Sequence, residues 1–183
     1  MLTLGITIGV VLLLKWMMSA LRDSAVEAAG SDWEGFARRH ELHANGAFLH
    51  GTYKGYSLVV DTVERKVGRQ TVLRAVLHLM VPSMPIGIEL KRGGLFDGVV
   101  NPVRTTPAFD TLMKHPRIAQ SFEKASGSYS DFYIEKGFLH AERGGLPETA
   151  AELAAFIAPA LELAIALDEV IRSGGAQEQR AAP

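Results

Sequence analysis

The sequence contains no cysteine. Without thiols the chain can form no disulfide, and it offers neither a thiolate nucleophile nor a cysteine-ligated zinc site. Its charge is nearly balanced, with a formal net charge of −1 at pH 7 and no concentrated stripe of lysine and arginine. A nucleic-acid-binding surface usually needs such a stripe, so we expect no nucleic-acid partner.

The sequence also lacks a recognisable nucleotide, nucleophile or metal motif. The segment His40-Glu41-Leu42-His43 resembles the zincin signature, but its histidines are separated by three positions. A zinc-binding helix needs a separation of four to place both rings on one face. We therefore expect surface or capping histidines here, and we expect no catalytic residue, no metal ligand and no cofactor.

What the sequence does contain is typical of one globular domain. The chain has 183 residues, of which 48% are hydrophobic and 21% charged. This length is near the usual size of a single domain, and the composition is far from that of disordered or collagenous chains. A folded core of about 140 residues buries roughly 68% of the surface of its unfolded chain, which is enough without disulfides.

The first 21 residues form the most hydrophobic segment. Residues 2–14 carry no charge, but as a helix they span only about 20 Å of a hydrocarbon core about 30 Å thick. Extension to Leu21 gives sufficient length, with Lys15 near the interface, where its amine can reach water. We predict a transmembrane helix over residues 1–21, anchored by Leu2, Leu4, Ile6, Ile8, Val10, Leu12, Leu14 and Trp16.

Two alternatives remain for this segment, a cleaved signal peptide and a helix lying on the membrane surface. The first favours positive charge before the apolar run, whereas here Lys15 and Arg22 follow it. The second requires a polar face, which residues 2–14 lack. The same following charges predict a single-pass protein of the inner (cytoplasmic) membrane with its domain in the cytoplasm. Gly5 and Gly9 are spaced for close helix packing, which would allow a homodimer.

After the predicted anchor we expect a linker over 22–31, a globular domain over 32–173 and a disordered tail over 174–183. A capping box of Ser31 and Glu34 predicts the start of a helix that ends near His40. Alternating hydrophobicity and turn residues predict strands at 47–53, 56–63, 71–81, 86–91, 132–135 and 138–141. Short helices are expected at 109–113 and 116–124.

A long apolar helix closes the domain. We expect it to begin at Pro147, to bend at Pro159 and to end at Gly174-Gly175. Strands followed by a helix, without regular alternation, predict an α+β fold: an N-terminal transmembrane helix followed by an antiparallel sheet packed with helices.

Strand 71–81 has a predicted orientation. Leu73, Ala75, Leu77, Leu79 and Val81 should share one face, and Arg74, Val76, His78 and Met80 the other. The aromatic residues Trp33, Phe36, Tyr53 and Tyr56 are expected to pack in the core or against the sheet.

A basic turn is expected at residues 65–70, where Arg65, Lys66 and Arg69 lie close together. Beside a membrane, such residues could contact anionic headgroups, each contributing about 1 kcal/mol. The alternative is a solvated hairpin tip.

The order of elements is similar to that of a known group. A helix led by Trp33 and Phe36 precedes the segment 49–56 with its Gly-x-Tyr-x-Gly pattern, and Phe109-Asp110, a late hairpin and an apolar helix follow. Over residues 33–172 this arrangement resembles a loose group of uncharacterised bacterial proteins, which often carry a membrane segment beside the same α+β domain. The resemblance implies a fold and no activity.

Together these features favour a membrane-tethered, non-enzymatic binding or scaffolding module with an unknown protein partner. One alternative is a membrane-associated enzyme whose site forms only in the fold. A pocket lined by two or more of Asp61, His78, Asp110 and Asp131 would favour it. The other alternative is a domain that contacts anionic lipid through the basic turn.

Overall fold

A computed structural model describes residues 27, 29–68, 70–84, 90–92 and 102–181. The predicted transmembrane helix, Arg69 and most of the expected linker lie outside these residues. A helix over 29–39 comes first. The elements that follow are β1 (His43–Ala44), β2 (Leu49–Tyr53), β3 (Tyr56–Val67), β4 (Gln70–Met80), β5 (Leu90–Arg92), β6 (Pro102–Thr105), α2 (Pro107–Met113), α3 (Pro116–Ser128), β7 (Asp131–Glu135), β8 (Phe138–Gly144) and α4 (Ala150–Ala181).

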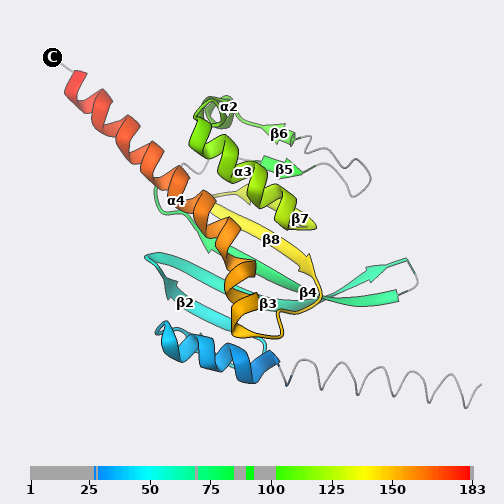
Figure 1. The fold of residues 1–183 in the computed structure, drawn as a ribbon. Helices are drawn as coiled ribbons and strands as arrows, with labels where there is room; N and C mark the ends of the chain where they lie inside the picture. The colour runs from blue at the N-terminus through cyan, green and yellow to red at the C-terminus, as the bar shows by residue number, and fades with distance from the viewer. Residues whose placement is uncertain (1–26, 28, 69, 85–89, 93–101, 182–183) are drawn as a thin grey trace, which may run out of the picture.

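The described strands form one sheet in the order β1-β2-β3-β4-β8-β7-β5-β6, and each pair of neighbouring strands is antiparallel. Strands β1 to β4 follow one another as a meander, and the late hairpin β7–β8 joins them because β8 pairs with β4. The helices lie against this sheet in Figure 1. The predicted α+β class, with an antiparallel sheet packed with helices, is therefore confirmed.

The core lies between α4 and one face of the sheet. Val60, Leu77, Ala141 and Phe132 are successive partners across four strands, and each is at most 1% exposed. The predicted orientation of strand 71–81 is confirmed, since Ala75, Leu77, Leu79 and Val81 are buried while His78 is exposed. Val76 differs from expectation because it is also buried, on the opposite face.

Helix α4 supplies the other half of this core. Within the described part of the chain, its segment Ala150–Ser173 is long and apolar enough to cross a membrane, but 56% of its most apolar window is buried inside the protein. The predicted apolar stripe packs in the core, including Leu153, Phe156, Ile157 and Leu163. Its hydrophobicity is therefore explained by packing on the sheet.

Pro159 interrupts the hydrogen-bond ladder of α4, because proline has no backbone N–H. Next to it, the buried Tyr129 hydroxyl donates to the Phe156 carbonyl at 2.6 Å and accepts from the Ala160 N–H at 3.0 Å. These are the two backbone groups that an uninterrupted helix would pair. Figure 1 shows α4 changing direction along its length, as expected for proline and an inserted hydroxyl.

The start of α4 differs from the prediction. Pro147 precedes the helix, and its carbonyl accepts a buried hydrogen bond of 2.8 Å from the Trp33 indole. Thr149 caps the first turn through its hydroxyl, which accepts from the Glu152 N–H. The Asp32 carboxylate accepts from the Ala150 N–H at 3.0 Å, so the helix over 29–39 and α4 are joined at this end.

Both outer boundaries of the domain also differ. The first helix already includes Ala29, which is fully buried, so Ser31 is an interior residue and not the expected cap. Helix α4 continues through Gly174-Gly175 to Ala181, so the expected stop is wrong. Two glycines cost a helix about 2 kcal/mol, but the residues after them are mostly good helix formers.

Two strand predictions need correction. Residues 102–105, expected as loop, form β6 at the edge of the sheet, where proline is tolerated at the first position.

The expected turn at 65–70 is mostly strand, since β3 runs to Val67 and β4 begins at Gln70. Pairing of β3 with β2 ends at Val60, and pairing of β4 with β8 begins at Ala75. The remainder forms a two-stranded ribbon that projects from the sheet in Figure 1.

Replacement of Leu77 by aspartate tests the orientation of β4. We expect Leu77→Asp to remove several kcal/mol of stability, because an unpaired carboxylate would be buried against α4. The matched variant His78→Asp places the same charge on the exposed side and should be tolerated far better. Thermal unfolding of both proteins checks this, and the reverse order would show that the strand faces the other way.

Replacement of Tyr129 by phenylalanine tests the bridge in α4. Removal of the hydroxyl leaves the Phe156 carbonyl and the Ala160 N–H without this partner, which should lower the free energy of unfolding by about 1–3 kcal/mol. Tyr133→Phe, at a half-buried tyrosine on the other sheet face, is the control and should have a smaller effect. Equal losses in urea denaturation would contradict the role of the bridge.

Candidate functional site

The sheet face opposite α4 carries the polar and aromatic residues of interest, and we call it the open face. The strand register aligns one transverse row of positions across this face. The row consists of His43, His50, Val59, His78, His140, Tyr133 and Lys91. Four of the six histidines of the chain therefore lie in one line, although they belong to four different strands.

The centre of the row is a group of stacked rings. The Tyr133 ring stacks on the His140 ring at 4.3 Å, and His78 meets His140 edge-on at 4.7 Å. His140 is only 5% exposed, whereas His78 is exposed. Next to this group, the cross-strand partners Met80 and Phe138 are 39% and 41% exposed. The open face thus combines a fixed aromatic group with an accessible apolar pair.

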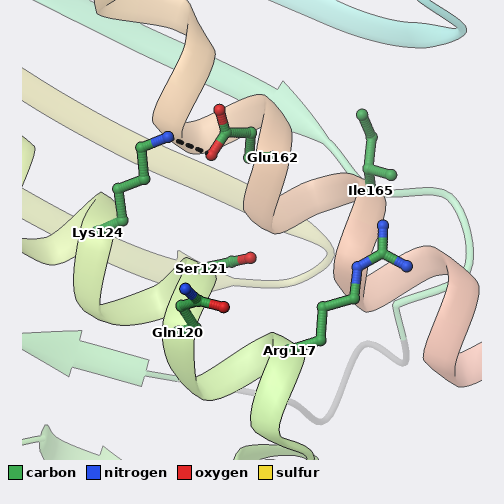
Figure 2. Close-up of a pocket in the computed structure, with 6 residues that line it drawn as sticks. All are labelled: Arg117, Gln120, Ser121, Lys124, Glu162 and Ile165. Atoms are coloured by element: carbon green, nitrogen blue, oxygen red, sulfur yellow. Dashed lines mark hydrogen bonds and ion pairs between the residues drawn. The ribbon is translucent and has the colours of Figure 1, made fainter.

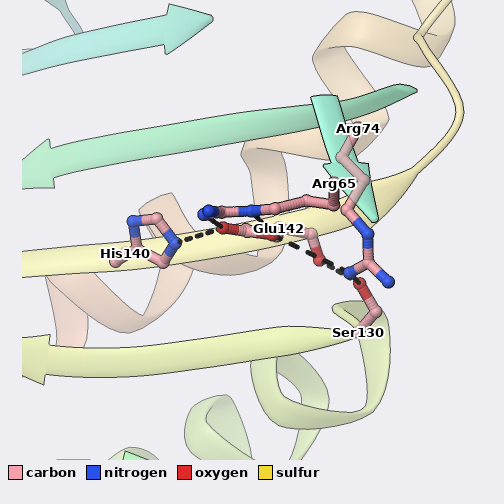
Figure 3. A network of polar contacts seen from close by, with 5 residues as sticks. All are labelled: Arg65, Arg74, Ser130, His140 and Glu142. Carbon is pink, nitrogen blue, oxygen red and sulfur yellow. Dashed lines mark hydrogen bonds and ion pairs between the residues drawn. The ribbon is translucent and has the colours of Figure 1, made fainter. Parts of the chain in front are cut away.

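A buried carboxylate, Glu142, lies beside His140 on the same strand face. Glu142 is 3% exposed, and Arg65 donates to it at 2.5 Å from the neighbouring ribbon. His140 Nε2 lies 3.2 Å from the same carboxylate oxygen. Figure 3 shows the Arg65 side chain lying across the sheet so that its guanidinium reaches Glu142.

A second arginine completes this ion cluster. The Arg74 guanidinium is 3.8 Å from the other Glu142 oxygen and donates to the Ser130 hydroxyl at 2.8 Å. Ser130 in turn donates to the Glu142 carbonyl at 3.0 Å. The cluster of Arg65, Arg74, Ser130, His140 and Glu142 (Figure 3) therefore joins β3, β4 and β8 to the residue before β7.

The protonation states follow from these contacts. Burial raises the pKa of Glu142, but the hydrogen bond and charge of Arg65, followed by His140, lower that pKa by more. Burial lowers the pKa of His140, the neighbouring His78 lowers it further, and Glu142 opposes them less strongly. At neutral pH we therefore assign a charged Glu142 and a neutral His140 that donates from Nε2. Its Nδ1 has no hydrogen-bond partner among the described residues.

Three residues of this region have the geometry to hold a metal ion. Asp131 is the direct register partner of Glu142, and His140 and Glu142 are two residues apart on one strand. Ligand atoms of Asp131, His140 and Glu142 all lie within 4.8 Å of one another. In the arrangement described, however, the charge of Glu142 is already balanced by arginine.

The structure brings together only some of the residues singled out from the sequence. Asp61, His78 and Asp131 share the open face by register, whereas Asp110 lies on α2 and is exposed. Arg65 and Lys66 are neighbours in β3 and therefore point to opposite faces. The first helix ends at residue 39 and His43 lies in β1, so His40 and His43 share no helix face, as expected.

Sequence reasoning missed Arg74, His140 and Glu142 as site residues. The available signal was the alternation in Phe138–Gly144, where His140 and Glu142 occupy one face of a strand. We expected this strand to end at residue 141, and a short strand offers no reason to single out Glu142. The two arginines come from another hairpin, and sequence spacing does not show that contact.

Among the clefts formed by the described residues, two small ones lie away from the cluster. The larger, about 380 Å³, lies between α3 and α4 and is lined by Arg117, Gln120, Ser121, Lys124, Glu162 and Ile165 (Figure 2). Its cations are engaged, since Lys124 pairs with Glu162 at 2.6 Å and Arg117 pairs with Glu169. Paired surface charges of this kind offer little to a ligand.

The smaller cleft, about 190 Å³, lies at the turn between β2 and β3 and includes Tyr56, Asp168 and Arg172. Asp168 is 6% exposed, and it accepts from the Tyr56 hydroxyl at 3.3 Å, from Ser83 and from Arg172 at 2.7 Å. These partners account for a charged residue in an apolar helix, so we interpret Asp168 as structural.

Comparison with known proteins finds no matching family model, no matching curated protein and no matching solved structure. The resemblance to bacterial proteins with a membrane segment therefore stays a prediction. The function must be inferred from the geometry of the described residues.

Replacement of Glu142 by glutamine tests the ion cluster and its pH dependence. At pH 7 we expect Glu142→Gln to lower the unfolding free energy by about 3 kcal/mol, because it leaves the arginines without their buried partner. A carboxylate whose folded pKa is lowered stabilises the protein above its unfolded value near 4.5, and this stability is lost as the pH falls further. The difference between wild type and variant should therefore shrink below pH 4.5.

The control for this experiment is Glu162→Gln, which removes an ion pair whose side chains are 57% and 48% exposed. We expect a loss below about 1 kcal/mol. Urea denaturation at several pH values measures both variants. A Glu142→Gln loss no larger than the control, or one that does not depend on pH, would contradict the assignment.

Proposed function

We propose that this protein is a membrane-tethered, non-enzymatic binding module whose binding surface is the open face of the sheet. Residues 1–21 supply the anchor in the inner membrane, and the domain lies in the cytoplasm. The observation that carries the proposal is the pairing of exposed Met80 and Phe138 beside the stacked rings of Tyr133, His140 and His78.

The chemistry of the open face favours a protein partner. Exposed apolar and aromatic side chains bordered by arginine are typical of protein interfaces. The charges at its centre are balanced internally, because Arg65 and Arg74 are engaged with Glu142. A polyanion such as nucleic acid would find few free cations there. We therefore propose a partner that presents apolar side chains to Met80 and Phe138.

Contact with anionic lipid through the β3–β4 ribbon is a second candidate function. Lys66 has no ion pair among the described residues, and Val67 at the ribbon tip is 52% exposed. In Figure 1 the ribbon points to the same side as the N-terminal end of the first helix. Arg65 contributes less than expected, because it pairs with Glu142.

A cross-linking experiment in intact cells tests the proposed function. A photoreactive amino acid at position 138 of the full-length protein should yield a discrete cross-linked protein in the membrane fraction. The same group at Glu162, on the exposed side of α4, is the matched control and should yield none. We expect Met80→Asp to abolish the adduct from position 138.

Three outcomes would count against the proposal. Equal adducts from positions 138 and 162 would exclude a specific open face. Recovery of full-length protein in the soluble fraction after carbonate extraction would remove the anchor. Lipid adducts from position 67, without a protein adduct from position 138, would favour the ribbon.

A further inference from the structure

The side chains of Asp131, His140 and Glu142 meet on the open face in an arrangement suited to metal binding. Residues two apart on a strand point to the same face, and a direct cross-strand partner lies within about 5.5 Å. His140 and Glu142 have this spacing, and Asp131 is opposite Glu142. Three ligands from two paired strands therefore converge without any loop.

The distances are close to those that a metal requires. Ligand atoms at about 2.1 Å from a tetrahedral zinc ion are roughly 3.4 Å apart. His140 Nε2 and the Glu142 oxygen are already 3.2 Å apart, and the whole set lies within 4.8 Å. Asp131 is the most exposed of the three, so its side chain can close the remaining gap by rotation.

The orientation of the His140 ring favours the same place. His140 is 95% buried, since only 5% of it is exposed, and Nε2 is the ring nitrogen that faces Glu142, at 3.2 Å. On metal binding the ring proton moves from Nε2 to Nδ1, which leaves the Nε2 lone pair for the ion. Stacking on Tyr133 fixes the ring plane, which is what a ligand to a metal requires.

We propose that Asp131, His140 and Glu142 bind a divalent transition-metal ion of the zinc class, which replaces the Arg65 guanidinium at Glu142. Arg65 reaches this position from the ribbon, and its side chain is 52% exposed, so it can turn into solvent. One imidazole and two carboxylates suit zinc better than magnesium, which prefers oxygen ligands alone. Arg74 keeps its contact with Ser130 and stays as an outer neighbour.

Titration of the full-length protein in detergent with ZnCl₂ at pH 7, followed by calorimetry, tests this site. We expect one zinc ion per chain, and Asp131→Asn should weaken binding at least about tenfold. Arg65→Ala should tighten binding about tenfold, because it removes the competing cation. Cobalt should bind to the same site and give visible absorption bands that His140→Ala abolishes, whereas MgCl₂ should not compete.

The exposed cross-strand pair of His43 and His50, with rings 5.2 Å apart, supplies the matched control. His50→Ala should leave the zinc affinity unchanged. Loss of binding in His50→Ala but not in Asp131→Asn would assign the metal to that surface pair and overturn the proposal. Absence of zinc binding by the wild type would overturn it, as would an Arg65→Ala affinity equal to or below that of the wild type.

Asp131 is partly exposed, so we expect Asp131→Asn to fold even if His140→Ala does not. The zinc titration of Asp131→Asn then still tests the site. Circular dichroism of each variant identifies that case. Zinc binding is measured on the purified protein, so failure of this inference leaves the cross-linking result for the proposed partner unaffected.

Discussion

A proline in the middle of a long core helix removes one backbone donor and bends the chain, and the packing of this domain depends on how that defect is accommodated. The Tyr129 hydroxyl lies between the Phe156 carbonyl and the Ala160 N–H and serves both groups. Burial raises the pKa of Tyr129, so the hydroxyl keeps its proton and can both donate and accept. Phe156 and Ala160 belong to the core between α4 and the sheet. The bridge therefore holds α4 against the buried face of the sheet, whose other side is the open face.

The open face depends on a different kind of constraint, which is the placement of charge. Glu142 lies on a strand with neighbours on both sides, where a lone carboxylate would be unfavourable. Arg65 and Arg74 come from the β3–β4 hairpin, so the ribbon is tied to β8 through their side chains. Such a buried cluster adds little net stability by itself, but it fixes the relative positions of the groups it joins. The histidine and tyrosine rings beside the cluster are therefore also held in fixed positions.

The elements with strong local patterns could be predicted, and the contacts between distant strands could not. The hairpin of β2 and β3 and the inward face of β4 follow from alternation and from the Lys54-Gly55 turn, which are properties of neighbouring residues. The ribbon was missed because the charged run at residues 64–66 resembles a turn, although β4 pairs with it along its length. The start of α4 was misplaced because its caps include Asp32, more than a hundred residues away.

The candidate site, too, depends on contacts between distant strands that the sequence does not predict. His78 and Asp131 were named from the sequence as residues that could line a pocket, but the residues that surround them in the fold were not. His140 joins the line of histidines only because β8 pairs with β4, and nothing in either strand specifies that register. The cluster at Glu142 depends on the same pairing. Sequence patterns therefore predicted the faces of individual strands, while the chemistry arises from how those faces are aligned.

The pairing of β4 with β8 also has a consequence for synthesis on the ribosome. Strands β1 to β4 can form hairpins as soon as they emerge, since each pairs with the next in sequence. The partner of β4 on its other side is β8, so the edge of β4 stays open until nearly the whole chain is made. Open strand edges are templates for association with other chains, and long-range pairings form slowly. The interval between translation of Met80 and of Gly144 is therefore when this protein is most exposed to misassembly.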